Sequence, residues 1–234
     1  MSSKLIRSVS KLVCYTIFLV ATLFLNTSHA TIWGEVGDAG DLLNTAQIPT
    51  GAGPLNTITG TVATSFDVDL YKIKVINPTT FSAFLFGGEG PNDWDSILTL
   101  FDENGFGVYR NDDAIIDVGD SGLPVNHTFG PQVSGIYYLA ISDDDIGPLS
   151  GAASSINDLI FPQSILPFTQ VFGPTGNGAA LPLAAWGSLD SEVVLNAGYD
   201  INLTGAEFVV PIPSAVWLFL SGLIGFLGIR KKVI

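Results

Sequence analysis

Acidic and amide side chains stand at the ends of several predicted strands, and their oxygens are the chemistry this sequence offers most clearly. Calcium takes about six to eight oxygen ligands from carboxylates, amides and carbonyls. If loops at one edge of a sandwich converge, such side chains would form a calcium site. The alternative is that they are turn-forming acids that keep the protein soluble. The candidate ligands are Asp102, Asn104, Asn111, Asp112, Asp113, Asp143, Asp144 and Asp145.

The spacing of these acids matches no standard calcium loop. No stretch has the D-x-[DN]-x-[DN]-G order of an EF-hand. Residues 87–93, GGEGPND, approximate the GGxGxD repeat once and are one residue too long. The calcium prediction therefore depends on folding to bring the loops together, and calcium is the only cofactor the sequence suggests.

No catalytic constellation can be picked out. Gly119-Asp120-Ser121-Gly122 matches the tetrapeptide around a chymotrypsin-like serine, but that triad needs an upstream histidine, and His127 follows Ser121. Cys14 is the only cysteine and lies near the N-terminus, so the rest of the chain has no thiolate nucleophile or disulfide. We predict a protein that is not an enzyme and has no catalytic residues. The alternative is a carbohydrate-active or other hydrolase, since nothing selects a catalytic pair among the 22 acids.

The charges are partitioned along the 234 residues. Of nine basic residues, three lie in the first eleven positions and three in the last five, whereas all 22 acids lie between. Three basic residues against 22 acids give this middle part a net charge of −19. Phosphate backbones repel such a body, which argues against a nucleic-acid partner.

Residues 1–30 have the pattern of a secretory signal peptide. Lys4, Arg7 and Lys11 precede an apolar run at 12–25, and a small residue, Ala30, ends the segment. This order predicts export by the Sec machinery and cleavage by signal peptidase between Ala30 and Thr31. An uncleaved anchor is the alternative, but the run is shorter than the roughly 20 residues that span a membrane.

Residues 210–234 form a three-part tail. Val210-Pro211-Ile212-Pro213 precedes an apolar segment at 214–229, and Arg230, Lys231 and Lys232 follow it. As a transmembrane helix, the apolar segment would be about 24 Å long, marginal for a hydrocarbon core of about 30 Å. The basic residues would stay in the cytoplasm by the positive-inside rule, leaving the acidic body outside.

The tail VPIPSAVWLFLSGLIGFLGIRKK resembles the PEP-CTERM sorting signal of Gram-negative bacteria along nearly its whole length. The resemblance implies an exosortase that processes the chain at the motif 210–213, and a product on the cell surface or in the exopolysaccharide matrix of a biofilm. Ile212 stands where the commonest motif has Glu, which bears on which exosortase acts. The alternative is a plain anchor that holds the protein permanently on the periplasmic side of the inner membrane.

Between these ends the sequence alternates like short strands. Tyr71, Ile73 and Val75 fall on one face of 68–75, and Tyr137, Leu139 and Ile141 on one face of 135–142. Residues 80–85, 97–101, 106–110 and 199–203 alternate similarly, and Asn104-Gly105 predicts a hairpin turn. We predict one all-β domain over 31–209, an antiparallel, jelly-roll-like β-sandwich.

Part of this body resembles the bacterial pre-peptidase C-terminal domain, a jelly-roll-like sandwich. The resemblance lies in DVDLYKIKV, DSILTLFDENGFGVYRNDD and SGIYYLAIS and covers about residues 35–142. Such domains accompany secreted enzymes, but residues 143–209 are short and hold no histidine or cysteine. Residues 143–190 are rich in proline and glycine and are predicted to form a long loop or insertion.

Overall fold

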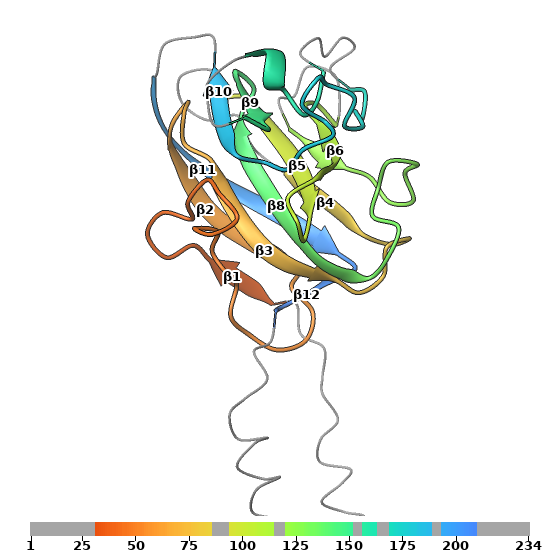
Figure 1. The fold of residues 1–234 in the computed structure, drawn as a ribbon. Helices are drawn as coiled ribbons and strands as arrows, with labels where there is room; N and C mark the ends of the chain where they lie inside the picture. The colour runs from red at the N-terminus through yellow and green to blue at the C-terminus, as the bar shows by residue number, and fades with distance from the viewer. Residues whose placement is uncertain are drawn as a thin grey trace, which may run out of the picture.

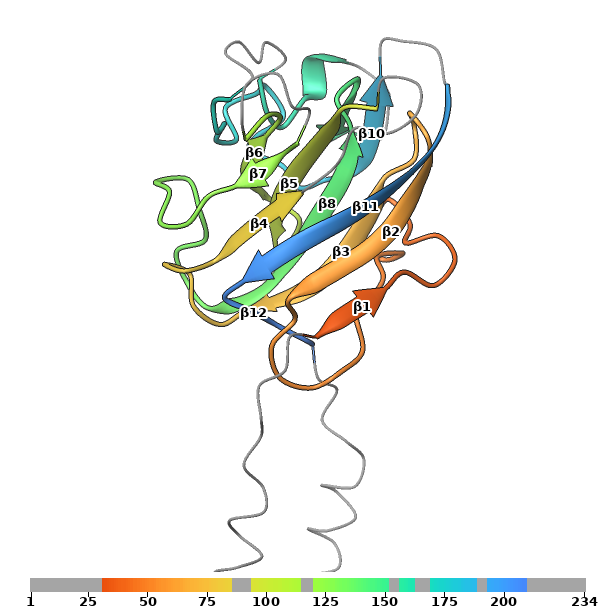
Figure 2. The ribbon, with the colours of Figure 1, turned by 180° about the vertical axis from the view of Figure 1, so that it is seen from behind.

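The computed structural model describes residues 31–85, 94–114, 120–151, 156–162, 169–188 and 193–209. The predicted signal peptide, cleavage residue Ala30 and the whole tail from Val210 lie outside the described residues. The two adjacent sheets of the body are visible from both sides (Figures 1 and 2).

Five strands form the first sheet, in the order β1-β2-β11-β4-β7. All neighbours are antiparallel except β1 and β2, which are parallel. Buried and exposed side chains alternate along the whole of β11, as expected for a strand with one face on the core. The strands are β1 (Ile32–Gly34), β2 (Thr57–Thr64), β4 (Ser82–Leu85), β7 (Gly122–Leu123) and β11 (Val194–Thr204).

Five further strands form the second sheet, in the order β12-β3-β8-β5-β6, and all neighbours are antiparallel. The pairing of β5 with β6 confirms the hairpin predicted at Asn104-Gly105. The strands are β3 (Asp69–Val75), β5 (Ser96–Asp102), β6 (Gly107–Asn111), β8 (Gly135–Asp143) and β12 (Ala206–Glu207).

The facing sides of the two sheets enclose the main core. Tyr71, Ile73 and Val75 from β3 and the predicted inward residues of β8 pack in one buried cluster with Ile201 and Leu203 of β11. The structure therefore confirms the all-β fold predicted from the hydrophobic alternation, with two packed sheets arranged like a sandwich.

A second core lies on the other face of the β3–β8–β5 sheet. Phe101 of β5 packs edge-to-face on Phe161, with ring centroids 6.4 Å apart, and on Trp186, at 6.0 Å. The segment predicted as a long loop thus supplies a covering layer. It contains β9 (Ile146–Leu149) and β10 (Ala185–Ser188), paired antiparallel, and the 3-10 turn η1 (Ile156–Asp158).

The two ends of the described body lie together. Asn56 donates its backbone N–H to Thr31 O, at 3.0 Å, and the neighbouring Leu55 donates to Ala206 O, at 3.1 Å. Both ends of the described body lie near β1 and β12, whereas β9 and β10 are at its far end (Figure 1). Among the described residues, no helix is long and apolar enough to cross a membrane, and the predicted span 214–229 lies outside them.

Candidate cation sites

Three strand ends of the second sheet converge at the end of the body remote from Thr31. Ser96 at the start of β5 is opposite Asp143 at the end of β8, and Leu98 is opposite Asn111 at the end of β6. Acids just beyond these positions must therefore lie near one another. We call them the loop cluster: Asp95, Asp112, Asp113, Asp143, Asp144 and Asp145.

The carboxylates of the loop cluster fall into two close groups. Asp95, Asp112 and Asp113 each offer an oxygen within 4.8 Å of the others, and Asp143, Asp144 and Asp145 do the same. The backbone joins the two groups, because Asp144 donates its N–H to Asp95 O at 3.0 Å. This part of the calcium prediction has the required convergence of loops.

Asp112 is the residue in this cluster that most needs a cation. Its side chain is only 2% exposed, and neither carboxylate oxygen receives a hydrogen bond from any described residue. The nearby Arg110 is also buried, but its Nη2 donates to Ile146 O, at 3.1 Å. Lys74 forms an ion pair with Glu207. A buried carboxylate without a partner is costly, and a bound cation would remove that cost.

Burial also favours the protonated form of these acids. It raises the pKa of Asp112 to about 8, helped by the charges of Asp95 and Asp144 and opposed by Arg110. Burial, with repulsion from Asp144, likewise raises the pKa of Asp143 to about 7 and that of Asp95 to about 6. Without a cation, the loop cluster thus retains protons near neutral pH.

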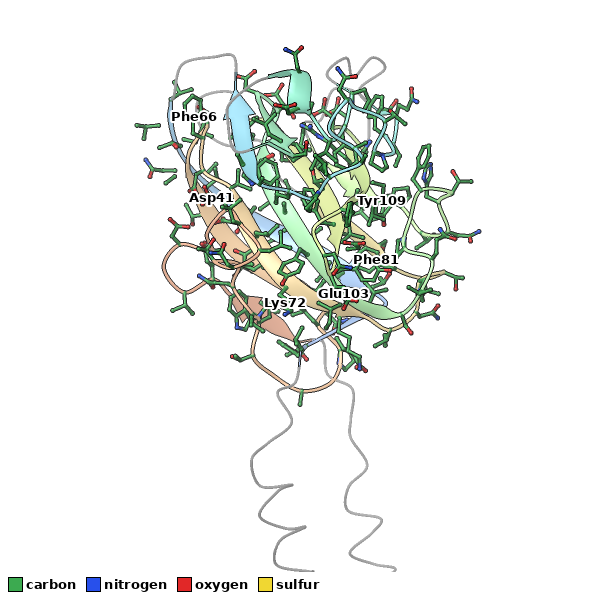
Figure 3. All side chains as sticks on the ribbon, viewed as in Figure 1. Asp41, Phe66, Lys72, Phe81, Glu103 and Tyr109 are labelled. Carbon is green, nitrogen blue, oxygen red and sulfur yellow. The ribbon has the colours of Figure 1, made fainter. Side chains whose placement is uncertain are left out.

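Two predicted ligands are not brought to this cluster. Asp102 and Asn104 lie at the opposite end of β5. The hairpin turn joins the end of β5 to the start of β6, whereas the loop cluster lies at the start of β5 and the end of β6, one strand length away. The Asp102 carboxylate accepts the N–H groups of Asn104 and Phe106, both at 2.9 Å, so it closes the turn. Figure 3 labels Glu103 in this turn.

Asn111 is close to the cluster but has another role. Its Oδ1 accepts the N–H of Gly122, at 3.0 Å, and its Nδ2 donates to Gln170 O, at 3.2 Å. The side chain thus ties β6 to β7 and to the covering layer. Asp95, which the prediction omitted, takes its place among the candidate ligands.

A second acidic group, also not predicted, lies at the β1–β2 edge. We call Glu35, Asp38, Asp67 and Asp69 the edge cluster. Glu35, Asp38 and Asp67 line an open hollow of about 750 Å³, together with Thr59, Gly60 and Tyr199. Asp38, Asp67 and Asp69 each offer an oxygen within 4.8 Å of the others.

Asp69 is the buried member of the edge cluster, at 1% exposure. Its Oδ2 accepts the hydroxyl of Tyr199, which also bonds to the hydroxyl of Tyr71, whereas Oδ1 receives no hydrogen bond from an N–H or hydroxyl group. Burial raises the pKa of Asp69 to about 8, opposed by Tyr199 and reinforced by the charges of Glu35 and Asp67.

Backbone amides fix the other edge carboxylates. The N–H groups of Gly40 and Ala63 donate to Asp38 Oδ1 (2.8 Å) and Asp67 Oδ2 (2.7 Å), and those of Ala39 and Thr61 donate to the two oxygens of Glu35 (both 3.0 Å). The side chains of Glu35 and Asp69 are hydrogen-bonded to each other. Glycosidases instead keep their two carboxyl groups about 5 Å or more apart.

The Gly119–Gly122 tetrapeptide has a structural role where it is described. Ser121 is fully buried, and its Oγ shares a hydrogen bond with Ser96 Oγ at 2.9 Å. The ring of His127 stacks on Tyr109, with centroids 6.3 Å apart, and its Nδ1 accepts the N–H of Phe129. Neither contact is that of a serine nucleophile and its base.

The fold defines the class of this protein as an all-β, sandwich-like body. No family model matches the chain, and no curated protein matches it. The resemblances of the tail and of residues 35–142 therefore stay predictions drawn from their motifs.

Proposed function

We propose that this protein is an exported, non-enzymatic surface or matrix protein whose jelly-roll-like body is stabilised by calcium at the loop cluster. An exosortase processes it at Val210–Pro213, and it associates with exopolysaccharide. The observation that carries the calcium site is the buried, unpartnered carboxylate of Asp112 among five other acids. Extracellular calcium modules commonly bind at about 10⁻⁴ to 10⁻³ M, which suits an exported protein.

The arrangement of the body supports presentation outside the cell. Thr31 and Ala206 meet at one end, close to where the signal peptide and the sorting tail attach in sequence. Asp143, Asp144 and Asp145 of the loop cluster lie at the end of β8 and before β9, and these strand ends are at the other end of the body (Figure 1). A body held by that tail would direct its acidic loops away from the membrane, where calcium could link them to an acidic polysaccharide.

Thermal unfolding tests the calcium site. We expect the Tm to rise between excess EDTA and millimolar calcium, because an ion bound only by the folded state at about 100 times its Kd adds about 2.7 kcal/mol. Asp112→Asn should abolish that rise, and in EDTA it should raise the Tm above about pH 8, where Asp112 ionises but the amide stays neutral. Equal Tm values with and without calcium in the unaltered protein would rule the site out.

Intact-mass analysis of cellular and secreted protein tests the sorting. A new C-terminus near Pro211–Pro213 and an N-terminus at Thr31 are expected. Recovery of a single species that ends at Ile234 would contradict exosortase processing.

Hydrolysis of polysaccharides by the purified protein would contradict the non-enzymatic role.

A further inference from the structure

We infer that the edge cluster is a second divalent-cation site, in which Asp38, Asp67 and Asp69 supply carboxylate ligands. It is independent of the loop cluster. The site takes a hard cation of the calcium type, because all of its candidate ligands are oxygens.

The geometry brings one oxygen of each carboxylate together. The three oxygens lie within 4.8 Å of one another, close enough to share one ion bound at about 2.3–2.6 Å from each. Asp67 and Asp69 come from the β2–β3 turn and the start of β3, and Asp38 comes from the segment after β1. A cation would therefore connect the edge strand to the second sheet.

Asp69 indicates that something must neutralise this position. It is buried, and its Oδ1 has no N–H or hydroxyl donor, although its Oδ2 is held by Tyr199. The unpartnered oxygen is on the carboxylate that groups with Asp38 and Asp67. Without a cation, the hydrogen bond between Asp69 and Glu35 keeps a proton on this buried pair. A cation shared by Asp38, Asp67 and Asp69 would replace that proton and compensate all three carboxylates.

No basic side chain of the body takes this role. Lys72 lies over the ring of Tyr138, at 5.6 Å, Lys74 pairs with Glu207, and Arg110 bonds to Ile146. These are the three basic residues between positions 12 and 229. The groups whose charges act on Asp69 are the carboxylates of Glu35 and Asp67.

The ligands are also held in advance. Backbone N–H groups already orient Asp38 and Asp67, each through one oxygen, so a cation would bind without ordering mobile side chains. Asp38 and Asp67 line the hollow and are reached from solvent, which provides an entry path and room for water ligands.

Calcium stoichiometry tests the inference, measured on the purified protein by equilibrium dialysis at millimolar calcium. Asp38→Asn/Asp67→Asn should bind one ion fewer than the unaltered protein and should keep the calcium response at the loop cluster. The amide oxygens can still accept the N–H groups of Gly40 and Ala63. Asp200→Asn is the matched control, because Asp200 also lines the hollow but is not one of the three grouped carboxylates; it should bind as many ions as the unaltered protein.

The outcomes separate the two sites. If the double variant binds as many ions as the unaltered protein, the second site is excluded, and ions lost with Asp112→Asn still support the loop cluster. If ions are lost only with the double variant, the edge site stands and the loop proposal falls. Absence of bound calcium would overturn both cation sites. At the edge cluster, a proton shared by Glu35 and Asp69 would then be the neutralising group. Near-UV circular dichroism in EDTA checks folding, and Asp67→Asn alone replaces the double variant if that variant is unfolded.

Discussion

Gly60 shows how one residue without a side chain makes the edge cluster accessible to Tyr199. A Cβ at position 60 would lie 2.2 Å from the Tyr199 hydroxyl and 2.7 Å from Glu35 Oε2. Tyr199 is directly opposite Gly60 in the β2–β11 pairing. The missing side chain therefore gives the phenol room to cross the strand and reach Asp69.

Gly60→Ala should lower the stability by about 1–3 kcal/mol, the usual cost of overpacking a buried site. Gly198→Ala is the matched control on the partner strand, because its Cβ would meet only Gly60 O, at 3.9 Å. We expect that control to change stability by no more than about 0.5 kcal/mol. Urea unfolding of both variants measures the difference, and equal midpoints would contradict the close approach.

Asp102→Ala distinguishes a turn cap from a calcium ligand. The variant loses the acceptor for Asn104 and Phe106, which should cost about 1 kcal/mol. The rise in Tm on adding calcium should match that of the unaltered protein. Loss of the calcium response would instead place Asp102 at a bound ion.

At the scale of elements, the covering layer makes the described residues 143–151, 156–162 and 169–188 part of the folded body. Phe161 is fully buried against Phe101, and Trp186 anchors β10 by donating its Nε1–H to Asp41 O at 2.7 Å. The layer thus contacts both the second sheet and the segment after β1. A dispensable loop would leave the outer face of β5 and β8 exposed.

Phe161→Ala should destabilise the whole body by about 3–5 kcal/mol, the range for large buried aromatics. Leu181→Ala, in the same segment but 57% exposed, should change stability by less than about 0.5 kcal/mol. A single unfolding transition at reduced urea is expected for Phe161→Ala. A near-neutral effect would mean that the segment is not packed on the sheet.

The sequence predicts those strands whose hydrophobic side chains alternate between two faces, and it misses strands defined by distant contacts. β3 and β8 are readable because every second side chain enters the main core. β9 and β10 are not, because IGPL and AWGS are short and contain proline or glycine, and they gain their structure by pairing with each other.

The same distinction holds for the candidate sites. Asp112 and Asp143 stand at predicted strand ends and could be found from the sequence. The edge cluster could not, because Glu35 and Asp69 are 34 positions apart and meet only through the packing of β1 beside β2. Asp102 is among the predicted ligands because the sequence does not show at which end of the sheet an acidic turn will lie.

For the whole molecule, excess negative charge and burial both raise the pKa of carboxyl groups in the folded protein. Asp69 and Asp112, each with a pKa of about 8 in the folded protein, ionise near 4 in the unfolded chain. Between these values the folded state binds more protons, so its stability falls as the pH rises. The stabilisation is fully present below about pH 4 and is lost as the pH rises through about 8.

In EDTA, we therefore expect a higher Tm at pH 5 than at pH 8. Calcium should stabilise most at pH 8, where bound protons no longer compete for the carboxylates. Asp112→Asn should flatten the pH dependence measured in EDTA. A Tm that rises from pH 5 to pH 8 in EDTA would contradict the retained protons at both clusters.

Because the two ends of the body lie together, the order of the strands along the chain could be changed by circular permutation. Because Thr31 and Ala206 are both bonded to the adjacent residues Asn56 and Leu55, a short peptide could join the ends without crossing the body. New termini could then be opened in the turn after Asp102. Such a circular permutant would keep both sheets while its point of attachment moved, so the end of the molecule facing a surface could be reversed by design.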